Sequence, residues 1–204
     1  NLLIKKTNIE NIIQKTDIKN LDLIGSHVNL SGLEVETAND SNRAFVLKEI
    51  LNLKKDSLLK KYDNIFIDCP PSLSLLTIMA LVASDEILVP LQTEFFALEG
   101  ITQLIKTIDR IKIGLNPELM IRGILLTMYD KRNKLSEQIE SDVRDNLGAL
   151  VYDTVIPRNV RLSEAPSFSM PALIYDHKCT GAIAYQKLAA ELLKREHDFM
   201  RQGK

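Results

Sequence analysis

Residues 65–73 read IFIDCPPSL, and the predicted fold is organised around them. The stretch begins as an apolar run that breaks at Asp68, and two prolines then precede a new apolar pattern. Near-continuous apolar runs are typical of buried strands in parallel sheets. Because Pro70 cannot donate a hydrogen bond to a sheet and Pro71 suits the first turn of a helix, the stretch predicts a strand that ends at Asp68, followed by a helix.

Asp68 has two interpretations at the end of such a strand. Open α/β sheets bind their ligands outside the carboxyl ends of the strands, and a carboxylate there can hold Mg²⁺ next to a phosphate. Alternatively, Asp68 only ends the strand and caps the helix that follows. The residue pattern by itself is compatible with both interpretations.

Length and composition indicate one domain of an ordinary soluble protein. The 204 residues are 45% hydrophobic and 26% charged, which is typical of globular proteins, and no domain boundary is apparent. No apolar run reaches membrane-span length and no signal peptide opens the sequence, so we expect a cytoplasmic protein without a membrane partner. The two cysteines are too few for a disulfide framework. A net charge of −1 excludes a strongly basic protein but not a local basic patch.

Predicted strands alternate with predicted helices along the chain. Apolar runs predict strands at residues 21–24, 65–68, 86–91, 121–128 and 152–156. Helical periodicity predicts helices at residues 41–61, 72–82, 97–113, 135–147 and 181–194. Residues 29–42 and 158–179 are expected to be irregular. This alternation predicts an α/β fold with a mostly parallel sheet flanked by helices.

Four segments of the chain together resemble the ParA/Soj branch of the ParA–MinD ATPases. They are residues 62–76 (YDNIFIDCPPSLSLL), 89–100 (VPLQTEFFALEG), 123–130 (GILLTMYD) and 154–167 (TVIPRNVRLSEAPS), with a weaker fifth at 175–185 (YDHKCTGAIAY). They occur in family order and cover most of the chain from residue 62 onward. The segment 154–167 is the most diagnostic of the ParA branch.

The resemblance implies a P-loop NTPase fold and a function in DNA partition. In this family, two subunits with bound ATP and Mg²⁺ form a homodimer that binds DNA without sequence preference. A ParB-type partner stimulates hydrolysis, and the cycle moves chromosomes or plasmids apart. We therefore expect a cytoplasmic, nucleoid-associated partitioning ATPase.

The same resemblance implies a nucleotide site. Asp68 corresponds to the Walker B-type carboxylate, which would make it both a catalytic residue and a Mg²⁺ ligand through a water molecule. Met128, Pro157 and Arg158 correspond to parts of the wall around the adenine. These assignments come from the resemblance and not from residue spacing.

Basic residues follow two of the predicted strands and have two interpretations. Lys131, Arg132 and Lys134 follow one strand, and Arg158 and Arg161 follow another. From composition alone, such charges are solvated surface. The resemblance instead favours Arg132 and Arg161 as DNA-binding residues, and it does not do so for the lysines.

The phosphate-binding loop of the family does not occur in this sequence, because no GxxxxGK[ST] stretch is found in the 204 residues. In the family, that loop and an aspartate-rich stretch would precede residue 1, so the chain resembles a ParA-type domain that is incomplete at its N-terminus. The loop cradles the β- and γ-phosphates. We therefore expect that the chain alone does not turn over ATP.

Two alternative functions remain open from the sequence. A MinD-like division-site ATPase would act at a membrane, but residues 192–204 (LLKREHDFMRQGK) have mixed charge and match an interfacial helix poorly. A non-catalytic truncated ParA remnant would explain the missing phosphate loop. Measurable ATP turnover would exclude the second alternative.

Overall fold

The computed structural model describes residues 3, 7–52 and 61–202. The chain forms two compact units. Unit 1 contains Asn1–Asp85 and Ile108–Leu119, and unit 2 contains Glu86–Thr107 and Met120–Lys204. The single domain expected from the sequence stays a prediction.

Unit 1 is built from short elements. Its strands β1 (Gln14–Lys15) and β2 (Asp22–Leu23) form an antiparallel pair, which agrees with the strand predicted near residues 21–24. The expected irregular stretch 29–42 contains a short helix, so that prediction is partly wrong. The helical elements are η1 (Ile9–Asn11), η2 (Val28–Gly32), α1 (Leu33–Glu36), η3 (Arg43–Phe45), α2 (Val46–Asn52) and α3 (Leu75–Ala83). Part of the predicted helix 41–61 lies outside the described residues.

The core of unit 1 joins α1, α2 and α3. Leu33, Val46 and Met79 are buried together, one from each helix. Asn116, almost fully buried, donates from its side-chain amide to the carbonyls of Leu81 (3.0 Å) and Ser84 (2.8 Å). These bonds satisfy carbonyls at the end of α3, where a helix leaves them without partners.

The predicted strand that ends at Asp68 is wrong. Residues 64–70 form no regular element, and Ile65 and Phe66 are 51% and 78% exposed rather than buried. A β-strand is stabilised by backbone hydrogen bonds to a neighbouring strand. Among the described residues, the parallel sheet consists of β3 and β4 alone, and neither pairs with this segment. The apolar run therefore lacks the ladder that would order it.

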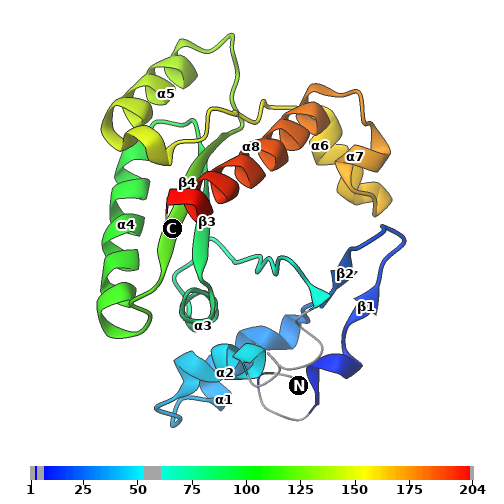
Figure 1. The fold of residues 1–204 in the computed structure, drawn as a ribbon, viewed down its shortest axis with the longest axis vertical. Helices are drawn as coiled ribbons and strands as arrows, with labels where there is room; N and C mark the ends of the chain where they lie inside the picture. The colour runs from blue at the N-terminus through cyan, green and yellow to red at the C-terminus, as the bar shows by residue number, and fades with distance from the viewer. Residues whose placement is uncertain (1–2, 4–6, 53–60, 203–204) are drawn as a thin grey trace. The chain divides into compact units, whose positions relative to one another are not determined.

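Unit 2 contains the parallel pair that confirms the α/β prediction. Strands β3 (Glu86–Gln92) and β4 (Met120–Thr127) run side by side, from Glu86 opposite Met120 to Gln92 opposite Thr127. Parallel strands need a crossover, and α4 (Ala97–Gly114) provides it (Figure 1). Helix α4 begins in unit 2 and ends in unit 1.

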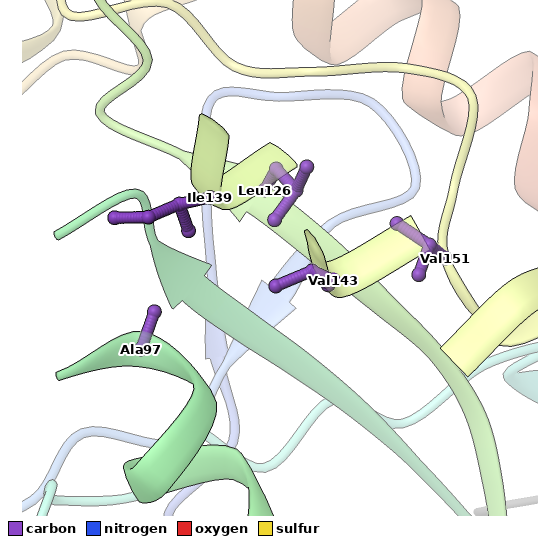
Figure 2. Close-up of a cluster of buried hydrophobic side chains, with 5 residues drawn as sticks. All are labelled: Ala97, Leu126, Ile139, Val143 and Val151. Carbon is purple, nitrogen blue, oxygen red and sulfur yellow. The ribbon is translucent and has the colours of Figure 1, made fainter. Parts of the chain in front are cut away.

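Alternate residues of β4 face two different layers. Leu126 packs with residues of α4 and α5 (Lys134–Leu147) (Figure 2). Ile124 packs with β3 and α4. Leu125, between them, packs instead with α8 (Thr180–Gln202). This is the period of two that a strand imposes on its side chains. The sheet therefore has α4 and α5 on one face and α8 on the other.

A third segment runs beside β4 without forming a regular strand. Tyr152 N–H donates to the Ile124 carbonyl, and Ile156 N–H donates to the Leu126 carbonyl, both at 2.9 Å. Between these bonds the segment uses more residues than β4 does, so it bulges away from the ladder. The strand predicted at 152–156 is therefore reduced to isolated bridges at its two ends.

The rest of unit 2 is helical. The elements are η5 (Gly148–Leu150), α6 (Val160–Glu164), η6 (Ala165–Phe168) and α7 (Ala172–Tyr175). The expectation that residues 158–179 are irregular is thus partly wrong. None of the helices in the described part of the chain is long and apolar enough to cross a membrane.

Gly123 is the position in unit 2 where an added methyl group has least room. A Cβ there would lie 2.4 Å from Cε2 of Tyr152, whose ring is fully buried. We expect Gly123→Ala to lower the free energy of unfolding by about 1–3 kcal/mol, because the core around Tyr152 is overpacked. Urea unfolding of the purified chain measures this change.

Gly100→Ala is the matched control, because Gly100 lies in α4 with open space around its Cβ position. Alanine there should stabilise the helix by about 0.5–1 kcal/mol. Equal effects of the two substitutions would contradict the role assigned to the Tyr152 contact.

Candidate functional site at the carboxyl ends of the strands

Two loops of unit 2 lie side by side where β4 and the segment parallel to it end. Tyr129 forms an isolated parallel bridge with Pro157. Tyr129 N–H donates to the Ile156 carbonyl (3.1 Å), and Arg158 N–H donates to the Tyr129 carbonyl (2.9 Å). The structure therefore brings Met128, Pro157 and Arg158 together, which the predicted adenine wall requires.

Met128 has an unusual backbone conformation for a residue with a side chain. Its φ is +55°, in the left-handed region, and its side chain is 41% exposed. This conformation costs on the order of 1–2 kcal/mol relative to ordinary backbone. Such conformations persist where surrounding structure enforces them, often at functional sites. The exposed Met128 side chain offers an apolar surface at the end of β4.

Arg132 is held by Asp130 within the same loop. Its Nε and Nη2 donate to Asp130 Oδ1 and Oδ2 at 3.0 and 2.8 Å, and its backbone N–H donates to Oδ1 at 3.0 Å. The side-chain hydrogen bond from Arg132, with the backbone bond, lowers the pKa of Asp130 to about 2. The Arg132 side chain nevertheless stays 89% exposed.

The loop then passes directly into α5. Asn133 N–H donates to the Asp130 carbonyl (2.9 Å), and Asn133 Oδ1 accepts from the backbone N–H of Leu135 (3.0 Å). This is an N-cap, which satisfies one of the orphan donors at the start of the helix. The loop is thus anchored at both ends, and Arg132 projects from a fixed turn.

Arg161 lies in the first turn of α6, after the second loop. Asn159 caps this helix, accepting from Arg161 N–H at 2.9 Å and donating to Thr180 Oγ1 at 2.8 Å. Arg161 Nη1 is 2.9 Å from Glu164 Oε2, and Nε is 3.6 Å from Asp176 Oδ2. Arg161 therefore also carries carboxylate partners.

Asp68 belongs to unit 1 and is exposed, whereas the other predicted site residues belong to unit 2. Its neighbour Cys69 is also exposed. Partial desolvation of the sulfur, and then the charge of Asp68, raise the pKa of the Cys69 thiol, so this thiol is mostly protonated near neutral pH.

The described residues contain no group of three or more His, Cys, Asp or Glu side chains able to hold a metal. Mg²⁺ is commonly bound through one or two carboxylates together with waters and substrate phosphates. The exposed Asp68 carboxylate can provide one such ligand.

Glu191 is a positioning residue that the sequence did not reveal. Its Oε1 and Oε2 accept from the backbone N–H groups of Asp153 (2.8 Å) and Thr154 (2.9 Å). Arg195, one turn later on α8, donates to Glu191 (2.8 Å) and to the Val151 carbonyl (2.8 Å). The pair completes the hydrogen bonds of the bulged segment that leads to Pro157. The only sign of this role in the sequence is that Glu191 precedes Arg195 by four residues, the spacing of an ion pair on a helix.

A protein-family model described as an AAA domain matches residues 1–121. The chain is 52% identical over 184 residues to the chromosome partitioning protein ParA of Caulobacter vibrioides, covering 90% of this chain and 68% of that protein. It is 46% identical over 195 residues to the chromosome-partitioning ATPase Soj of Treponema pallidum, covering 96% and 76%. These matches run through both units.

Solved structures show the same fold. The chain is similar to the cobyrinic acid a,c-diamide synthase of Mycobacterium smegmatis with bound ATP analogue and magnesium, with a TM-score of 0.78, 30% identity, and 96% and 71% of the two chains covered. It is also similar to the cell division ATPase MinD of Pyrococcus furiosus, with a TM-score of 0.73, 26% identity, and 94% and 73% covered. The α/β fold is therefore P-loop NTPase-like, as expected.

The Glu191 carboxylate should make the stability of the chain depend on pH. Burial raises the pKa of Glu191. The hydrogen bonds from the N–H groups of Thr154 and Asp153 lower this pKa by a larger amount, so the pKa lies below the ordinary value of 4.5. A carboxylate whose pKa is lower in the folded state than in the unfolded state stabilises the fold. This stabilisation is complete above the unfolded-state pKa and is lost as the pH falls through the folded-state pKa.

Glu191→Gln should remove the contribution of Glu191 to this dependence and lower the free energy of unfolding by about 1 kcal/mol, because one of the two N–H groups, exposed or part-buried, loses its acceptor. Urea unfolding between pH 3 and pH 7 measures both effects, roughly spanning the carboxylate range. Glu196→Gln on the same helix is the control. A pH profile of Glu191→Gln that matches the unsubstituted chain would refute the assignment.

Proposed function

This chain belongs to the ParA/Soj family of chromosome-partitioning proteins, and we propose on that premise that it is the ATPase of a DNA partition system. It binds ATP and Mg²⁺, forms a homodimer in the ATP-bound state, and binds DNA without sequence preference. A ParB-type partner stimulates its hydrolysis of ATP. The protein acts in the cytoplasm, on the nucleoid, and segregates chromosome or plasmid DNA without a membrane partner.

The observation that best supports this proposal is the bridge between Tyr129 and Pro157. It joins the two loops that carry the proposed adenine wall and the proposed DNA contacts. Arg132 follows Met128 by four residues, and Arg161 follows Pro157 by four residues. A nucleotide bound against the two loops would therefore lie close to both arginine-bearing segments.

In the proposed nucleotide site, Met128 and Pro157 give the apolar wall for adenine, and Arg158 lies beside it. Asp68 would hold Mg²⁺ through a water molecule. Bound Mg²⁺ neutralises charge on the phosphates. The M. smegmatis structure with ATP analogue and magnesium supports this cofactor assignment by likeness of fold.

A MinD-like role at a division site remains the competing function because of the likeness to MinD. The two functions differ in the surface that the ATP-bound protein binds. Retention on DNA without retention on anionic vesicles supports partition. The reverse result would support the MinD-like role, and measurable ATP turnover by this chain would exclude a non-catalytic remnant.

Asp68→Ala should abolish Mg²⁺-dependent ATP turnover of the full-length protein, because the metal loses its carboxylate. Steady-state phosphate release at saturating Mg-ATP measures this. Asp63→Ala, an exposed carboxylate in the same stretch, should keep turnover near that of the unsubstituted protein. Normal turnover in Asp68→Ala would overturn the assignment.

Arg161→Ala should weaken DNA binding equally for all sequences. The loss of one phosphate contact lowers the slope of log affinity against log salt by about 0.9. Fluorescence anisotropy of a labelled random-sequence duplex over a salt series measures this slope. Lys106→Ala is the control, because Lys106 is exposed on α4 and lies on neither loop. Identical slopes for Arg161→Ala and the unsubstituted protein would refute the contact.

A further inference from the structure

Both arginines proposed to contact DNA are already paired with carboxylates of their own loops. Arg132 is paired with Asp130, and Arg161 with Glu164 and, at longer distance, Asp176. The Arg132–Asp130 and Arg161–Glu164 pairs are two and three residues apart in sequence, so both are local to the segments that carry the arginines. The proposed DNA surface is thus close to electrically neutral at its two key positions.

The Asp130–Arg132 pair occupies the donors that a phosphate would use. Arginine binds carboxylates and phosphates through two parallel N–H groups in the same fork geometry. Asp130 accepts hydrogen bonds from one edge of this fork, at 3.0 Å from Arg132 Nε to Oδ1 and at 2.8 Å from Arg132 Nη2 to Oδ2. A phosphate must therefore displace Asp130 from this edge or bind at the remaining Nη1 side beside a negative charge.

The carboxylate is fixed more firmly than the arginine. The Asp130 side chain is 25% exposed and also accepts the Arg132 backbone N–H, whereas the Arg132 side chain is 89% exposed. The hydrogen bonds from Arg132 keep the pKa of Asp130 far below neutral, so the carboxylate stays charged at any physiological pH. The guanidinium can therefore swing to a phosphate while its competitor remains in place.

The second arginine repeats the arrangement. Glu164 Oε2 is 2.9 Å from Arg161 Nη1 and also accepts the hydroxyl of Tyr175 at 3.2 Å. The Tyr175 side chain also interacts with Arg161, so tyrosine, glutamate and arginine form one local network. Each of the two arginines thus has a nearby carboxylate with which a phosphate must compete.

We propose that Asp130 and Glu164 are built-in competitors of the DNA phosphates, which set the DNA affinity of this protein below the value its arginines would give alone. This inference rests on the proposed function, because it assumes that Arg132 and Arg161 contact DNA. Exposed ion pairs are weak, so a phosphate can displace them. The competitors hence weaken the binding of DNA without preventing it.

Asp130→Asn tests the inference, because asparagine can keep the oxygen that accepts the Arg132 backbone N–H, while it removes the charge and the oxygen that accepts from Arg132 Nη2. We expect DNA affinity to rise about two- to fivefold at fixed salt, which corresponds to the loss of one exposed ion pair. The salt dependence should become steeper, because Arg132 then acts as an uncompensated cation. Anisotropy with full-length protein, Mg-ATP and a random-sequence duplex measures both.

Two comparisons separate the ion pair from a general change of charge. Glu137→Gln removes an exposed carboxylate at the start of α5 that is not hydrogen-bonded to Arg132, so it should raise affinity by less than Asp130→Asn. In an Arg132→Ala background, the gain from Asp130→Asn should fall to that of Glu137→Gln, because only the general change of charge remains. Glu164→Gln, alone and with Arg161→Ala, repeats this cycle for the second loop.

Each outcome decides the inference. A gain in Asp130→Asn that falls to the level of Glu137→Gln in the Arg132→Ala background supports it. An unchanged or weaker affinity in Asp130→Asn, or a gain that keeps its full size without Arg132, overturns it. The proposed DNA binding then stays intact if Arg132→Ala itself weakens binding. Absence of DNA binding by the unsubstituted protein at low salt overturns the proposed function and this inference together.

Discussion

The packing of Tyr152 against Gly123 is the contact on which the architecture of unit 2 depends. The ring is fully buried over a residue that has no side chain, and Arg195 covers it at 4.2 Å from the ring centroid. With Tyr152 so placed, the segment that follows must run beside β4. It then reaches the bridge at Pro157, and the two functional loops become neighbours.

The loops themselves show how a short sequence can hold functional groups without a large core. Asn133 and Asn159 cap the helices that follow the loops, and each cap lies within two residues of an arginine. Local hydrogen bonds thus orient the charged groups, while the apolar cluster around Leu126 holds the strand beneath them (Figure 2). Side-chain caps of this kind define loop geometry independently of distant packing.

The parts of the fold that were predictable are those with local causes. Helices α4, α5 and α8 show a clear helical period in their apolar residues. Strands β3 and β4 are apolar runs that pair with each other. The run before Asp68 is also apolar, but it forms no strand. A strand requires a neighbouring strand, and the hydrophobic pattern of a sequence does not show whether one is present. The candidate site residues were assigned from the resemblance alone. Their carboxylate partners and the Glu191 contact could not be assigned from the sequence, because they depend on side-chain geometry that spacing does not encode.

The contact between Glu191 and residues 153–154 also has a consequence for protein synthesis. The carboxylate lies 38 residues after the Asp153 N–H that it accepts. At about 5–20 residues per second, the ribosome needs roughly 2–8 s to make that distance. During this time the Glu191 carboxylate of α8 is not yet present to accept hydrogen bonds from the N–H groups of the bulged segment. The neighbouring loops therefore lack this stabilising contact. The nascent chain therefore completes this surface only when Glu191 of α8 has been translated.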